Sequence, residues 1–109
     1  MKQVKAYIKK HKLDPVIRAL REIQGLTGLS VIDSCGYGIG LGRGDEQTFS
    51  ECRPGVKLEI FCQCDLVDEV VKTITSAAHT GLKGDGKIYV SDIEQAVRIS
   101  TGESGDSAV

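Results

Sequence analysis

The order of strand-like and helix-like segments is the feature that most restricts how this chain can fold. Alternating apolar residues predict four β-strands, at residues 4–8, 29–35, 56–62 and 86–92. Apolar residues at helical spacing predict two helices, at residues 13–25 and 65–81. The resulting order β-α-β-β-α-β is typical of the ferredoxin-like fold, in which two helices cover one face of a four-stranded antiparallel sheet. We therefore predict a single α+β domain over residues 1–109.

The predicted strands carry apolar side chains on both faces of the sheet. Alternation separates two sets, which are Val31, Leu58, Ile60, Ile88 and Val90 on one face and Ile32, Phe61 and Tyr89 on the other. Two helices cover only one of these faces. An apolar second face in so small a chain favours self-association.

Charge and hydropathy argue against two classes of function. The formal net charge is -1, so the chain is not expected to bind nucleic acid. It contains no apolar run of about 18 residues, so we expect no membrane insertion. Residues 1–14 lack the apolar stretch of a secretory signal, which favours a cytoplasmic location.

The four cysteines give only weak indications of a metal or redox site. Cys62 and Cys64 are separated by one residue, which is not the spacing of a zinc-binding pair. Cys35 and Cys52 flank the segment between the second and third predicted strands. Antiparallel pairing could bring them together as a disulfide at the base of that segment, but separate reduced thiols are the favoured interpretation.

Two glycine-rich segments are candidates for function. Residues 36–55 are too long for a hairpin turn and have almost no periodicity, which predicts a long excursion from the sheet. Residues 84–87 read GDGK at the start of the last strand. Unobstructed backbone N–H groups and one ammonium suit a phosphate, although a turn with an exposed lysine is the simpler alternative.

Several sequence strings together resemble the P-II signal-transduction family. Residues 80–90 read TGLKGDGKIYV and residues 94–103 read EQAVRISTGE, similar to the second signature of that family. The N-terminal KAYIKKHKLDPVIRAL is similar to its first strand and helix, and LTGLSV is followed by GYG. The resemblance covers nearly the whole chain.

The resemblance implies a homotrimer with three adenine-nucleotide sites in the clefts between subunits. Residues 36–55 would be the T-loop, which docks onto a protein partner such as a membrane transporter, and residues 100–109 would form a polar tail. ADP or ATP, or AMP, would be the ligand. The phosphates would lie against Gly84, Asp85, Gly86 and Lys87, joined by Arg98. Gly28, Ser30, Gly36 and Gly38 would line the other wall, Glu59 and Phe61 would lie near the adenine, and Tyr7 would border the pocket.

The chain departs from the family pattern inside the T-loop and beside it. Gly40 replaces a glutamine that helps to hold Mg²⁺, and Gly55 replaces a lysine that binds 2-oxoglutarate. Tight 2-oxoglutarate binding is therefore not expected, and a role for Mg²⁺ is left open. Ser100 replaces a second phosphate-facing arginine, which favours weaker discrimination between ATP, ADP and AMP. The loop is about four residues shorter than in the family, and its hydroxyls, Thr48 and Ser50, are candidates for modification.

The sequence as a whole predicts a non-enzymatic P-II-like regulator of a transporter or an enzyme. A conventional nitrogen-regulatory protein that also senses 2-oxoglutarate is the main alternative. A slow ATPase is another, with Asp85 as the nearest candidate base, although this aspartate fits a turn better. A metal- or redox-responsive module built on the cysteines is the last.

Overall fold

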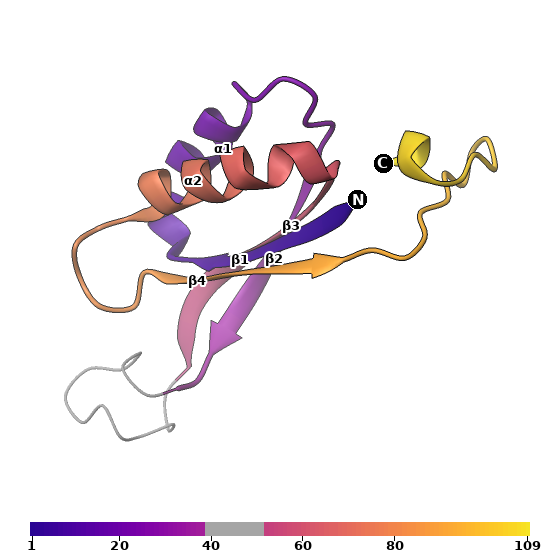
Figure 1. The fold of residues 1–109 in the computed structure, drawn as a ribbon. Helices are drawn as coiled ribbons and strands as arrows, with labels where there is room; N and C mark the ends of the chain where they lie inside the picture. Colours follow the sequence, from indigo (N-terminus) through magenta and orange to yellow (C-terminus); the bar gives the residue numbers. More distant parts are fainter. Residues whose placement is uncertain (39–51) are drawn as a thin grey trace.

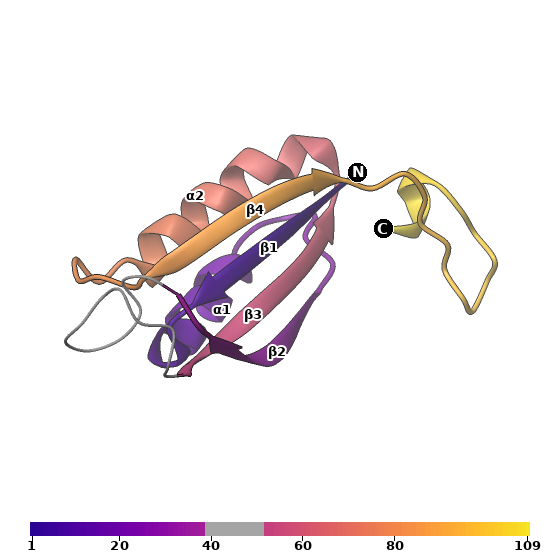
Figure 2. The ribbon, with the colours of Figure 1, turned by 90° about the horizontal axis from the view of Figure 1, so that it is seen from below.

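The computed structural model describes residues 1–38 and 52–109. Within these residues one antiparallel sheet has the strand order β2-β3-β1-β4. The strands are β1 (Lys2–Ile8), β2 (Leu29–Gly36), β3 (Arg53–Cys62) and β4 (Gly86–Asp92). Helices α1 (Leu13–Leu20) and α2 (Val67–Ala78) lie together on one face of the sheet (Figures 1 and 2). The predicted ferredoxin-like α+β fold is confirmed.

The hydrophobic core lies between the two central strands and the helices. Burial alternates along β1, where Val4, Ala6 and Ile8 are buried. The same alternation runs along β3 and meets the apolar stripes of both helices. The other buried residues are Val16, Leu20, Ile23, Val56, Leu58, Ile60, Cys62, Val70, Ile74 and Ala78. Side chains alternate between the two faces of a strand, so a slip of one residue in the pairing would turn the buried side chains toward the other face. Burial of this one face therefore fixes the register of the sheet.

The ends of several elements differ from the sequence-based prediction. Helix α1 ends at Leu20 rather than at Gly25, because residues 21–25 form turns and Gly25 adopts a φ of 90°. Helix α2 begins after a short 3₁₀ turn and ends at Ala78, because His79 is extended with φ -67° and ψ 130°. Strand β3 begins at Arg53 rather than at Val56, since its first residues pair with β2 as far as Gly36.

The sheet face opposite the helices remains open in the single chain. It carries four large side chains that are partly exposed, namely Tyr7 (38%), Ile32 (40%), Phe61 (43%) and Tyr89 (54%). The rings of Tyr7 and Tyr89 meet edge to face, with centroids 6.2 Å apart. The prediction of an apolar second face is therefore confirmed for these residues.

The chain after β4 leaves the sheet and folds back on itself. Val97 and Ser104 form an antiparallel bridge, and a short 3₁₀ turn, η3 (Asp106–Ala108), follows. Gln63 donates a hydrogen bond of 2.6 Å to the Asp106 carbonyl, which ties this segment to the end of β3. Figure 1 shows the segment beyond the end of β4, opposite the turn that precedes this strand. No helix within residues 1–38 and 52–109 is long and apolar enough to cross a membrane.

Candidate functional site

The turn between α2 and β4 is organised around the carboxylate of Asp85. The backbone N–H of Thr80 donates a 2.8 Å hydrogen bond to Asp85 Oδ2, and the Thr80 hydroxyl donates to Oδ1. The ammonium of Lys9 lies 3.2 Å from Oδ1, and His79 Nδ1 lies 3.5 Å from Oδ2. Asp85 is therefore a positioning residue of the turn, and both of its oxygens are engaged.

The same contacts determine the protonation of Asp85. The hydroxyl of Thr80, then its backbone N–H, and then Lys9 favour the charged carboxylate and hold the pKa of Asp85 far below its usual range. The side chain of Asp85 is 24% exposed, as is that of Lys9. The negative charge is thus permanent at neutral pH, and the ammonium of Lys9 lies directly beside it.

Gly86 is required where the turn enters β4. Its φ is 108°, a conformation that side chains with a Cβ rarely adopt. A Cβ built at this position would lie 1.7 Å from the carbonyl oxygen of Tyr7. The GDGK string therefore lets the turn approach β1 closely, which a residue with a side chain could not do without displacing backbone.

A cleft of about 900 Å³ lies between this turn, the end of β1 and the two arms of the residue 36–55 segment. Its lining includes six of the predicted ligand-binding residues, which are Gly36, Gly38, Gly84, Asp85, Gly86 and Lys87. Tyr7 also lines it. The structure thus brings the turn and the base of the residue 36–55 segment together, and we name this cleft the turn cleft.

The cationic side chains of the turn cleft differ in whether they form an ion pair. Lys9 is paired with Asp85, whereas the exposed Lys87 has no ion pair among the residues that the structure describes. Arg53, at the first position of β3, also lines the cleft. Lys87 and Arg53 therefore give the turn cleft a positive character suited to an anion.

The remaining predicted residues form a second group near the opposite end of the sheet. Gly28, Ser30, Glu59 and Phe61 line another cleft, of about 400 Å³, together with residues 95–97 and the C-terminal Val109. Ser30 and Glu59 are directly paired across β2 and β3. The carboxylate of Glu59 lies 3.2 Å from the ammonium of Lys57. We name this cleft the strand-end cleft.

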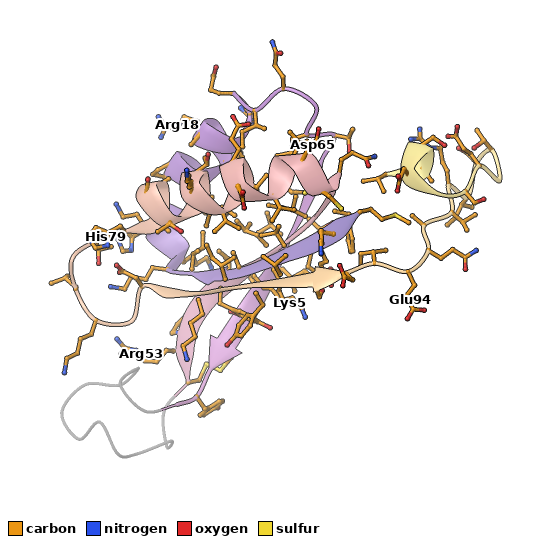
Figure 3. All side chains as sticks on the ribbon, viewed as in Figure 1. Lys5, Arg18, Arg53, Asp65, His79 and Glu94 are labelled. Carbon is orange, nitrogen blue, oxygen red and sulfur yellow. A yellow bond between two sulfur atoms is a disulfide. The ribbon has the colours of Figure 1, made fainter. Side chains whose placement is uncertain are left out.

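Arg98 lies in the folded-back C-terminal segment and not near the turn cleft. Its Nε is 3.6 Å from a carboxylate oxygen of Glu103, and its Nη2 is 3.5 Å from the Ser107 carbonyl. In Figure 3, Arg53 at the start of β3 and Glu94 after the end of β4 mark opposite ends of the molecule. The guanidinium of Arg98 is therefore remote from Lys87 of its own chain.

One chain does not bring the two groups of predicted residues into a single site. Gly36 pairs with Arg53, whereas Ser30 pairs with Glu59 six positions further along β3. At about 3.3 Å per strand residue, this offset separates the two groups by about 20 Å.

The pairing of β2 with β3 also joins two of the cysteines. Cys35 and Cys52 form a disulfide with their Cα atoms 5.3 Å apart. The expectation of two separate reduced thiols is therefore wrong, because the register that places Gly36 opposite Arg53 also brings these two positions within bridging distance. Cys62 is buried and Cys64 is exposed, both as free thiols. No three metal-ligating side chains cluster within residues 1–38 and 52–109.

The sequence did not single out three residues that line or organise the turn cleft, and three other residues that it did single out are not described by the structure. Arg53 was missed because the third strand was expected to begin only at Val56. Lys9 and Thr80 were missed because their contacts with Asp85 cross the fold. Gly40 and the hydroxyl-bearing Thr48 and Ser50 fall within residues 39–51, outside the described residues.

Comparison with known proteins places the chain among nitrogen regulators. The family model described as nitrogen regulatory protein P-II matches residues 1–103. The protein of that name from Bradyrhizobium diazoefficiens is 44% identical over 113 aligned positions, and that from Rhodobacter capsulatus is 47% identical over 114. Nitrogen regulatory protein P-II 1 of Escherichia coli strain K12 is 44% identical over 114.

These alignments cover all of this chain and all of each relative. The spans of 113 and 114 positions exceed the 109 residues of this chain, so each alignment contains gaps in this chain. The relatives are named as regulatory proteins and not as enzymes. Because the family match extends over all four strands, both helices and the turn cleft, and the relatives align with the whole chain, this chain is a member of the nitrogen regulatory protein P-II family.

Proposed function

We propose that this protein is a trimeric, non-enzymatic regulator that binds ADP, ATP or AMP in clefts between its subunits and signals their occupancy to a protein partner. The observation that carries the proposal is the division of the nucleotide-site residues between two clefts about 20 Å apart on one chain. Two chains, each supplying a different cleft, would complete a site that neither forms alone.

The turn cleft suits the phosphates of a nucleotide. Gly84 and Gly86 adopt positive φ angles of 80° and 108° and carry no side chain, so a phosphate can approach their backbone closely. Lys87 follows directly and supplies an ammonium without a partner in the described part of the chain. Charge-assisted hydrogen bonds from such groups are the strong contacts that hold phosphate.

The strand-end cleft of a neighbouring chain suits the nucleoside. Phe61 is 43% exposed and offers an aromatic face to an adenine ring. Ser30 and Glu59 lie beside it and can accept or donate hydrogen bonds at the edges of a base or ribose. Arg98, from the same end of that chain, would then approach the phosphates, as the resemblance to P-II proteins implies.

The open face of the sheet supports the trimer. This face exposes the apolar side chains of Tyr7, Ile32, Phe61 and Tyr89 to water. Association of chains would bury them, which is energetically favourable. In a closed ring, each chain offers its turn cleft to one neighbour and its strand-end cleft to the other. Three such contacts would give three equivalent nucleotide sites.

Occupancy would reach the partner through residues 36–55. Gly36 and Gly38 line the turn cleft, so a bound phosphate lies against one arm of this segment. A ligand that binds only one conformation of this arm increases the fraction of molecules in that conformation. The partner, such as a membrane transporter or an enzyme, would recognise the arrangement that the nucleotide favours.

Binding without hydrolysis is favoured by the state of Asp85. This aspartate is the nearest candidate base for an ATPase, but its oxygens are engaged by Thr80, Lys9 and His79. Gly55 lines the turn cleft without a cation, which favours nucleotide alone over a conventional sensor of nucleotide and 2-oxoglutarate.

Calorimetric titration of ADP into the wild-type protein and into Lys87→Ala tests the proposal. We expect binding to the wild type and a loss of about tenfold or more in the variant, because a charge-assisted phosphate contact is removed. Light scattering should report a mass of about three chains for both proteins. Unchanged affinity in a folded Lys87→Ala trimer would remove Lys87 from the site, and a monomer would refute the intersubunit cleft.

A further inference from the structure

Arg53 occupies a position in the turn cleft that the resemblance to P-II proteins did not identify. It is the first residue of β3, lies directly opposite Gly36, and lines the cleft together with Gly84 and Lys87. Its side chain is half-buried, and it makes no ion pair or hydrogen bond within residues 1–38 and 52–109. In Figure 3 it lies beside the start of β3, on the side of the molecule that carries the α2–β4 turn.

Among the residues that the structure describes, the neighbours of Arg53 leave its guanidinium available to a ligand. Arg53 and Gly55 share one face of β3, because strand side chains alternate with a period of two. Gly55 lines the cleft without a side chain, and a Cβ there would lie 3.0 Å from the carbonyl oxygen of Ile8 and 3.4 Å from the hydroxyl oxygen of Ser34. The only carboxylate that lines the cleft is that of Asp85 within the described chain, and it is already paired with Lys9.

Arg53 and Lys87 approach the turn cleft from opposite sides. Lys87 pairs with Tyr7, which pairs with Lys57, so Lys87 lies two strands across and four positions along from Arg53. These offsets put the two backbones on the order of 15 Å apart. Two long cationic side chains that converge across such a gap fit a chain of phosphates better than a single small anion.

We propose that Arg53 is a second phosphate-binding residue of the nucleotide site and contacts the phosphate chain from the side opposite Lys87. The assignment rests on the proposed function, since it takes the turn cleft as the phosphate end of that site. The planar guanidinium can hold two phosphate oxygens at once, whereas the ammonium of Lys87 acts as a point charge. Arg53 therefore compensates within the cleft for the cation that Ser100 does not supply.

The position of Arg53 also couples the phosphates to the T-loop. Cys52 precedes it directly and is bonded to Cys35, which precedes Gly36. A contact between Arg53 and a phosphate would therefore act on both arms of residues 36–55 at their base. This is the point at which nucleotide occupancy can most directly change the arrangement presented to a partner.

The test is calorimetric titration of ADP and of adenosine into the full-length wild type, Arg53→Ala and Arg53→Lys. Arg18→Ala is the matched control, because it removes an exposed arginine from α1, on the helical face away from the cleft. We expect Arg53→Ala to bind ADP about tenfold or more weakly, Arg53→Lys to fall between it and the wild type, and Arg18→Ala to match the wild type. Adenosine affinity should not change in any variant.

Two results would overturn the assignment in distinguishable ways. Equal ADP affinity in the wild type and in folded, trimeric Arg53→Ala would exclude Arg53 while leaving the proposed function intact. Absence of ADP binding to the wild type would refute the proposed function and the assignment together. An equal loss of ADP and adenosine affinity in Arg53→Ala would show a structural effect on the whole site and would also exclude a phosphate contact.

Discussion

Substitution of Gly86 by alanine should destabilise the protein through two effects that a second glycine can separate. Gly86 has a φ of 108°, and a Cβ there would lie 1.7 Å from the carbonyl oxygen of Tyr7. Gly81, in the same connection, has a comparable φ of 82°, but a Cβ there would meet nothing within 4 Å. Gly81→Ala therefore measures backbone strain alone, and Gly86→Ala measures strain and collision together.

The expected magnitudes follow from this difference. A left-handed backbone costs a residue with a Cβ about 1–2 kcal/mol, which is the whole effect expected for Gly81→Ala. In Gly86→Ala the new methyl group must also displace the pair between Ile8 and Gly86 at the end of the β1–β4 ladder. Opening that pair adds about 1 kcal/mol, for a total of about 2–3 kcal/mol.

Urea unfolding at neutral pH measures both free energies of unfolding under the same conditions. We expect Gly86→Ala to be the less stable variant and also to bind ADP more weakly, because its turn must move away from β1. An equal loss of stability in the two variants would refute the collision argument, and with it the claim that close approach at Gly86 sets the shape of the turn cleft.

Three further predictions follow from the site. The depressed pKa of Asp85 means that its contribution to stability is full above the unfolded pKa of about 4 and declines as pH falls below it; the urea midpoint should therefore fall more steeply on acidification in the wild type than in Asp85→Asn, and parallel profiles would contradict this. The Cys35–Cys52 disulfide spans a sequence separation of 17 residues, so its replacement by two serines should cost about 3 kcal/mol, and a dithiol reductant should lower the unfolding midpoint of the wild type alone; a midpoint insensitive to the reductant would count against the bond. Titration of 2-oxoglutarate into protein saturated with ATP and Mg²⁺ should give millimolar binding at best, because Gly55 supplies no cation; micromolar binding would return the protein to conventional nitrogen sensing.

The sequence predicted the fold well because each part of that prediction depends on local pattern. Apolar alternation located the four strands, and the GDGK string located the turn before β4. The helix ends were predicted poorly, because residues 21–25 keep a helical pattern although Gly25 and its neighbours form turns. Ile23 is nevertheless buried. The apolar spacing of residues 13–25 therefore predicted correctly that Ile23 is buried, but predicted incorrectly that it is helical.

The sequence named a set of candidate site residues but gave no arrangement for them. Nothing in the one-dimensional pattern indicates that Gly36 and Ser30, only six positions apart, belong to different clefts. That separation appears only when the pairing of Gly36 with Arg53 and of Ser30 with Glu59 is known. The same register decided the disulfide and placed Arg53 in the turn cleft, and both depend on contacts between segments distant in sequence.

The central claim, that each nucleotide site is shared by two chains, is tested most directly by mixing subunits. Lys87→Ala removes a residue of the turn cleft, and Phe61→Ala removes one of the strand-end cleft. The two variants carry different affinity tags, and mixed trimers are isolated by sequential purification. ADP is used at a concentration that fills the wild type but leaves both parent variants largely empty.

Every mixed trimer contains one junction at which an intact turn cleft faces an intact strand-end cleft. We therefore predict that mixed trimers bind about one ADP each with wild-type affinity, although neither parent binds at this concentration. A site contained within a single chain would be damaged in every subunit. Mixed trimers that bind no ADP would contradict the account.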